Sequence, residues 1–253
     1  MAAFGFALLA VMGLLLQCSP AATNAPDNAS APIQVQLMTS LPIIWGDGAS
    51  MESILSGKTS PAPIYSHWQK NYNITAVDSF EGLENSGTDI VLLAQPPAMD
   101  PADIAAIDAW VRAGGKVIIL TDPMLVWPTA LPLGDKRRPL ASGLLSPLLS
   151  HWGLALQMPD ATGSGRVELE FPQATVSTVG IGTFKPIAEP DESHAECALS
   201  IAHVMVRCKV GQGAAIILAD ADFLNDNLWA DKVRPSDSGA SQLIDLFVAD
   251  LRK

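Results

Sequence analysis

The segment that most constrains this fold is residues 89–123, which carry the pattern of one complete strand–helix–strand unit. Residues 89–94 and 116–121 are apolar runs of strand length. Between them, apolar residues recur at helical spacing: Ile104, Ile107, Trp110 and Val111. Asp100 is typical of a helix N-cap, and Gly114 of the left-handed residue after a helix. Two buried strands joined by one helix run parallel with a right-handed crossover, so the pattern predicts an α/β fold.

The rest of the chain extends this unit into a doubly wound, mostly parallel sheet with an antiparallel β extension. Further strands are expected in residues 33–37, 41–45, 74–77 and 214–219, and helices in 51–55, 61–71, 144–152 and 241–251. Residues 167–210 change to strands and turns, which predicts an antiparallel extension of the sheet or a small β sub-lobe. We therefore expect a signal or anchor segment with a linker in residues 1–32, and one α/β domain in 33–253 with a β-rich insertion around 165–210.

Composition excludes some classes of protein. Of the 253 residues, 49% are hydrophobic and 16% charged, which indicates a well-buried globular chain. The net charge of -11 repels phosphate backbones, so we expect no binding to nucleic acid.

The N-terminus indicates a location outside the cytoplasm. Residues 2–16 are uninterrupted apolar sequence, shorter than the roughly 20 residues that span a bilayer but suited to the core of a secretory signal, although no Lys or Arg precedes them. The residues before Cys18 resemble a bacterial lipobox, although Gln17 stands where a small residue is expected. The N-terminus has three possible fates: lipidation at Cys18, cleavage near residues 21–25, or retention as a membrane anchor. Each of them places the folded part in the periplasm.

Two cysteines, Cys197 and Cys208, lie in the predicted folded region. If the segment between them folds back on itself, the two sulfurs face each other, and an oxidising compartment then favours a disulfide. The alternative is a pair of free, half-buried thiols.

Three carboxylates form the sharpest candidate site. Asp122, Asp220 and Asp222 each follow an apolar strand, so all three can converge at the carboxyl edge of the sheet. Such a cluster can face a ligand, bind a divalent cation or perform acid–base chemistry. The alternative is that each carboxylate caps a turn or helix; we favour this over a metal site, and we expect no cofactor.

Two more residues follow strands at the same edge. Gln95 ends the first strand of the parallel pair, and Asp47 lies between two glycines after the opening strand region. The spacing of those glycines does not match a dinucleotide fingerprint, so no nucleotide is expected. No nucleophile-elbow motif occurs, which argues against a hydrolase of the Ser or Cys type.

Residues 124–139 form a long irregular stretch, and loops of this length in a compact domain are usually functional. The stretch contains three consecutive basic residues: Lys136, Arg137 and Arg138. In so acidic a chain they favour a contact with a partner, an anionic ligand or a lipid head group, against the alternative of a solvated loop. Trp127 in the same stretch lies in the core or lines a groove. The four histidines are scattered, without metal-ligand spacing.

Two pieces of sequence carry a family resemblance. The first is the run WVRAGGKVIILTDP within residues 89–123, and the second is GQGAAIILADADFL in residues 211–224. Together they resemble the GldG-like auxiliary proteins of ABC transport systems. The resemblance implies an extracytoplasmic domain similar to a flavodoxin or glutamine-amidotransferase sheet without the catalytic residues, and ABC permease or ATPase subunits as partners.

Three functions remain open from the sequence. The first is a non-enzymatic, membrane-associated auxiliary domain of a bacterial ABC transport system, with a partner or ligand at the carboxyl edge of the sheet. The second is a secreted metal-assisted hydrolase using Asp122, Asp220 and Asp222. The third is a stand-alone periplasmic ligand-binding protein.

Overall fold

The computed structural model describes residues 1, 31–159, 165–187, 195–230 and 233–253. The chain divides into two units, Met1–Ala31 and Pro32–Lys253, and the second of them is the α/β domain. Apart from residues 1, 31 and 32, the predicted signal or anchor segment with its linker lies outside the described residues, and so does Cys18. Within the described ranges, no helix has both the length and the apolar character needed to cross a bilayer.

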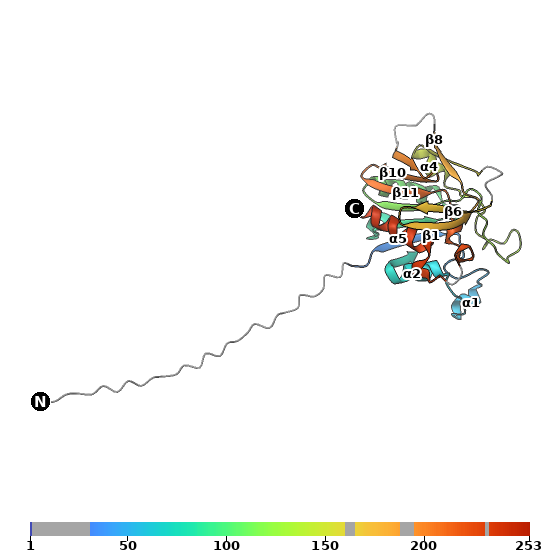
Figure 1. The fold of residues 1–253 in the computed structure, drawn as a ribbon, viewed down its shortest axis with the longest axis horizontal. Coiled ribbons are helices and arrows are strands. Elements are labelled where there is room, and N and C mark those ends of the chain that lie inside the picture. The colour runs from blue at the N-terminus through green and yellow to red at the C-terminus, as the bar shows by residue number, and fades with distance from the viewer. Residues whose placement is uncertain (2–30, 160–164, 188–194, 231–232) are drawn as a thin grey trace. The chain divides into compact units, whose positions relative to one another are not determined.

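A seven-stranded sheet forms the centre of the domain, in the order β2-β1-β3-β4-β11-β10-β9 (Figure 1). The first five strands in that order are parallel, and their succession along the chain gives the order 2-1-3-4-5 of flavodoxin-type sheets. The strands of this sheet are β1 (Gln34–Thr39), β2 (Asn73–Ala76), β3 (Ile90–Ala94), β4 (Lys116–Leu120), β9 (Glu196–Ser200), β10 (Met205–Val210) and β11 (Gly213–Leu218). The predicted α/β class with an antiparallel extension is confirmed.

The predicted strand–helix–strand unit of residues 89–123 folds as β3, α3 (Pro101–Arg112) and β4. Asp100 is the N-cap residue, but its side chain accepts no hydrogen bond from the helix; Pro101 at the first position instead presets the helical φ. Gly114 has φ +119° directly after the C-cap, a conformation that side chains disfavour, and this ends the helix.

The expected strand at residues 41–45 is absent: β1 ends at Thr39, and these residues form turns. Pro42 has no N–H to offer a neighbouring strand, and its carbonyl instead accepts from the Gly46 amide at 3.0 Å. Two helices follow, the short α1 (Met51–Leu55) and α2 (Pro63–Asn71). The apolar face of α2 covers the sheet, whereas α1 has no buried residue.

Alternate residues of each central strand enter different cores, as the pleat of a strand requires. Val91 and Leu93 belong to the core under α3 and α4 (Ser146–His151), whereas Ile90 and Leu92 belong to the core under α2 and α5 (Gly239–Leu251). The second core receives the apolar face of the C-terminal helix: Leu243, Ile244, Phe247, Val248 and Leu251. Helices thus cover both faces of the sheet.

The predicted strands of the β-rich part form two arrangements. β9 and β10 extend the main sheet, and their pairing places Cys197 opposite Cys208, with the two sulfurs joined in a disulfide. The other strands form separate two-stranded sheets, β5 (Leu154–Gln157) with β8 (Thr183–Pro186) and β6 (Arg166–Phe171) with β7 (Ala174–Val179). Both sequence alternatives, an extension and a sub-lobe, therefore describe part of this region. Short 3-10 turns complete the fold: η1 (Leu83–Asn85), η2 (Asp222–Leu224), η3 (Asp226–Leu228) and η4 (Pro235–Asp237).

Candidate functional site at the carboxyl edge of the sheet

The carboxyl ends of β3, β4 and β11 bring four of the candidate residues together. Gln95 follows β3, Asp122 follows β4, and Asp220 and Asp222 follow β11. All four are fully buried. Hydrogen bonds join Gln95 to the backbone of Asp122, and the charges of the three carboxyls act on one another. The convergence expected from parallel strands is therefore present.

Asp122 and Asp222 fasten the start of the long loop to this edge. Asp122 Oδ1 accepts from the Met124 amide at 2.7 Å, and Asp222 Oδ2 accepts from the Val126 amide at the same distance. Asp122 Oδ2 also accepts from the Ala221 amide at 3.3 Å. The two carboxyls thus replace the backbone partners that this irregular segment lacks.

Asp220 caps the turn that follows its own strand. Its Oδ1 accepts from the Phe223 amide at 3.1 Å, and its Oδ2 accepts from the Thr178 hydroxyl of β7 at 2.5 Å. This carboxyl therefore joins η2 to the β6–β7 hairpin, which is a structural connection between two segments far apart in the sequence.

Burial of these carboxyls changes their titration. Burial and the nearby charge of Asp222 raise the pKa of Asp122 to about 7, and burial raises the pKa of Asp222 to about 6. Burial and the charge of Asp122 hold the pKa of Asp220 well above its usual value. Asp222 Oδ1 is buried with no hydrogen-bond partner among the described residues, and a proton shared with Asp122 would give it one.

The arrangement offers little to a metal or a substrate. Across the residues that the structure describes, no set of three His, Cys, Asp or Glu side chains is placed to hold a metal ion. The carboxyl oxygens of Asp122 and Asp220 and one oxygen of Asp222 instead receive backbone and hydroxyl donors. Of the alternatives left open by the sequence, the geometry is that of capping.

The side chain of Gln95 also makes structural contacts. Its φ is +44°, an uncommon value for a residue other than glycine, and its side chain bridges two segments. The amide nitrogen donates to the carbonyls of Asp122 and Leu140, and the amide oxygen accepts from the Asp122 amide at 2.8 Å. Both polar atoms of the Gln95 side chain are therefore engaged with backbone partners.

Asp47 lies on the surface of the same edge and joins two loops. Its carboxylate accepts from the Thr129 hydroxyl at 2.7 Å and from the Ala130 amide at 3.0 Å. Asp47 thus connects the turn after β1 to the loop of residues 124–139, the two segments that form the outer surface here. We call these two segments, residues 45–58 and 124–139, the loop pair.

The three basic residues have different environments. Arg137 forms an ion pair with Asp135 at 2.6 Å and also donates to the carbonyls of Gly48 and Ala49. The guanidinium of Arg138 donates to the carbonyl of Leu131, in its own loop. Lys136 is exposed, and within the described part of the chain it has no ion pair. Of the three predicted partner-binding cations, Arg137 therefore joins the two loops, and Arg138 braces the loop of residues 124–139.

A family comparison agrees with the resemblance carried by the sequence. A model of proteins described as an ABC-type uncharacterized transport system matches residues 34–174, more than half of the chain. The chain belongs to this family. No curated protein matches the chain.

Solved structures of similar fold have very different sequences. An exo-beta-1,4-mannosidase, Op5Man5 from Opitutaceae bacterium strain TAV5, is 11% identical over 85% of this chain and 36% of its own, with a TM-score of 0.45. The mmIFT52 N-terminal domain is 11% identical over 87% and 97% of the two chains, with a TM-score of 0.48. The cytoplasmic protein STM3548 from Salmonella typhimurium is 10% identical over 86% and 98%, with a TM-score of 0.43. This chain spans about a third of the mannosidase, and the three matches carry no functional argument.

The loop pair carries a feature that the sequence analysis missed. Several of its large apolar side chains are exposed to solvent: Trp45, Met51, Leu55, Val126 and Leu133. Leu55 is 80% exposed and Leu133 90%. A helix of five residues and a proline-rich loop cannot bury such side chains. The presence of large apolar residues in these two segments is the sequence signal for an exposed apolar surface.

Histidine and tryptophan side chains mostly have structural roles. Trp152 is buried and donates from Nε1 to Asp108, and His151 lies 3.4 Å from the same carboxylate. His67 of α2 contacts Asp245 of α5 at 2.9 Å. The last contact holds together the two helices that cover one face of the sheet.

Proposed function

We propose that this protein is a non-enzymatic, extracytoplasmic auxiliary subunit of a bacterial ABC transport system, attached at the membrane through its N-terminal segment. Membership of the family supports the connection to ABC transport. The periplasmic location and the membrane attachment rest on the apolar N-terminal sequence.

The proposed mode of action rests on one observation, which is the exposed apolar surface of the loop pair. Single exposed apolar residues are ordinary, but five large ones on two hydrogen-bonded loops are typical of a protein interface. The polar residues beneath them are buried and bonded, which gives the loops a rigid support rather than an open reaction site. The loop pair is accordingly assigned to binding a permease or ATPase-associated partner subunit, with Lys136 at its edge.

The test is recovery of the partner from native membranes. The full-length protein would be captured after mild detergent extraction, and ABC permease or ATPase subunits quantified by mass spectrometry against an unrelated bait. We expect these subunits with the natural protein and a reduction of tenfold or more with Leu133→Glu.

A matched control keeps the result specific. Met158→Glu introduces the same charge at another exposed apolar residue, which follows β5. β5 pairs with β8, which lies away from α1 in Figure 1. Absence of any ABC subunit with the natural protein would refute the proposal, and equal losses with both variants would refute the assignment to the loop pair.

A further inference from the structure

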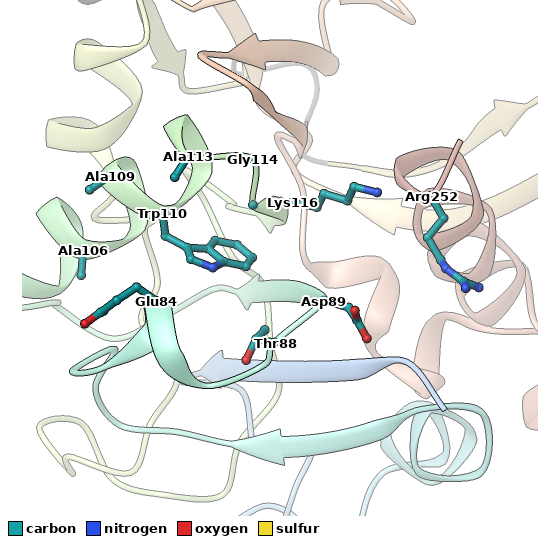
Figure 2. A pocket seen from close by; sticks show the side chains of 11 residues that line it. Glu84, Thr88, Asp89, Ala106, Ala109, Trp110, Ala113, Gly114, Lys116 and Arg252 are labelled. Atoms are coloured by element: carbon teal, nitrogen blue, oxygen red, sulfur yellow. The ribbon is translucent and has the colours of Figure 1, made fainter. Parts of the chain in front are cut away.

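The opposite, amino-terminal edge of the sheet carries an open groove of about 680 Å³ (Figure 2). One wall is α3, and the others are η1, the turn before β3, the start of β4 and the end of α5. The volume is within the range of small-molecule sites in proteins. Nothing in the loop pair contributes to it, so the groove is independent of the proposed partner surface.

Small residues and one tryptophan form the apolar part of the groove. Figure 2 shows the Trp110 indole among three alanines of α3, Ala106, Ala109 and Ala113. A side chain at Gly115 would lie 2.4 Å from the indole ring, so one face of the ring rests directly against the backbone of Gly115. The indole is half-buried, which leaves part of it available for an apolar ligand group.

Charges of opposite sign lie on the two sides of this indole. Glu84 is on one side, and Lys116 and Arg252 are on the other (Figure 2). In the ranges that the structure describes, none of these three side chains forms an ion pair. Asp89 also lines the groove, on the same side of the indole as Lys116 and Arg252 in Figure 2, and its Oδ2 already accepts from the Gln34 amide at 2.8 Å.

We propose that this groove binds a small zwitterion with an apolar side chain, of the class of amino acids and short peptides. The ligand ammonium group faces Glu84, its carboxylate faces Lys116 and Arg252, and its apolar part packs on Trp110. Arginine suits a carboxylate because its guanidinium presents two parallel N–H donors. A simple anion fits less well, because it offers no positive group to Glu84.

The experiment uses the full chain in detergent and isothermal titration with three probes. These are Leu-Leu with free termini, the same dipeptide acetylated and amidated, and inorganic phosphate. We expect saturable binding of the free dipeptide and binding at least tenfold weaker for the other two, because the capped peptide lacks both charges and phosphate lacks the ammonium group.

Variants assign the binding to this groove. Lys116→Met and Arg252→Gln should each weaken Leu-Leu by about fivefold to tenfold, as loss of one charge-assisted contact predicts. Lys70→Met, which removes an exposed lysine from the last turn of α2, outside both the groove and the loop pair, should leave the affinity unchanged. The proposal is overturned if Leu-Leu does not bind, if the capped peptide or phosphate binds equally well, or if Lys70→Met has the same effect as Lys116→Met.

Discussion

The two edges of the central sheet use polar residues in opposite ways. At the carboxyl edge, Asp122, Asp220 and Asp222 are fully buried and bonded to backbone or hydroxyl donors. At the amino edge, Lys116 and Arg252 line an open groove without ion pairs among the described residues. Acidic residues after strands therefore do not by themselves mark a reaction site. Here they form buried structural contacts at the carboxyl edge, and the charged side chains open to a ligand lie at the amino edge.

The largest effect should come from the pH dependence of the closed edge. The pKa values of Asp122 and Asp222 are about 7 and about 6 in the folded protein, above the unfolded value of about 3.9. The folded state therefore binds more protons, and the free energy of unfolding should fall by about 2–4 kcal/mol as pH rises from 4 through 7. Urea titrations at several pH values measure this decline.

Asp222→Asn should flatten that decline. An asparagine keeps an acceptor for the Val126 amide and offers a donor to Asp122, so it imitates the protonated Asp222 at every pH. Burial still raises the pKa of Asp122, so a smaller decline should remain. The control is Asp250→Asn, because hydrogen bonds from Lys253 and Arg207 hold the pKa of Asp250 below its usual value, outside this range of pH. A natural protein whose stability rises between pH 4 and 7 would contradict the account of the buried pair.

Alanine substitutions at two glycines test how tightly each edge of the sheet is packed. A side chain at Gly143 would lie 2.0 Å from Thr121 Oγ1, in the closed edge, and one at Gly115 would lie 2.4 Å from the Trp110 ring, in the groove. Thr121 is fully buried and cannot move aside, so Gly143→Ala should cost about 2–3 kcal/mol. Trp110 borders open space, so Gly115→Ala should cost about 1 kcal/mol.

Thermal and urea unfolding of both variants provide the measurement. If Gly115→Ala were the more damaging of the two, the amino edge would be the more tightly packed, and the contrast between the edges would be wrong.

The sequence predicted the parts of the fold that depend on local signals. The β3–α3–β4 unit was predicted because Pro101, Gly114 and the apolar period all lie within one segment. The turn at residues 41–45 resembles a strand in sequence because Leu41 and Ile43 alternate as apolar residues, and both are buried as they would be in a strand. Two features distinguish this turn from a strand: β1 ends at Thr39, and Pro42 has no amide hydrogen to donate.

The candidate site was predictable in position but not in role. Parallel strands place Asp122 and Asp220 at one edge whatever else the chain does. Their role depends on which amide reaches each oxygen, and the Val126–Asp222 contact joins residues 96 positions apart. Sequence periodicity carries no information on such contacts, nor on the surface that α1 leaves uncovered.

Asp47 provides a smaller effect on stability. Asp47→Ala removes the acceptor of the Thr129 hydroxyl and the Ala130 amide, both at the surface, where water replaces the lost partner. We expect a loss of about 0.5–1 kcal/mol in unfolding free energy and faster protease cleavage within residues 124–139. Unchanged cleavage would mean that Arg137 alone holds the loop pair together.

The smallest effect on stability should come from the open edge. Lys116 begins β4 and is half-buried, but it has no ion pair within the described ranges, so Lys116→Met removes a charge without leaving a buried partner unsatisfied. The free energy of unfolding should change by less than about 0.5 kcal/mol, whereas affinity for a zwitterionic dipeptide falls severalfold. A protein whose stability drops by several kcal/mol in this variant would show that Lys116 supports the fold. The amino edge would then be as closed as the edge that holds the buried carboxyls.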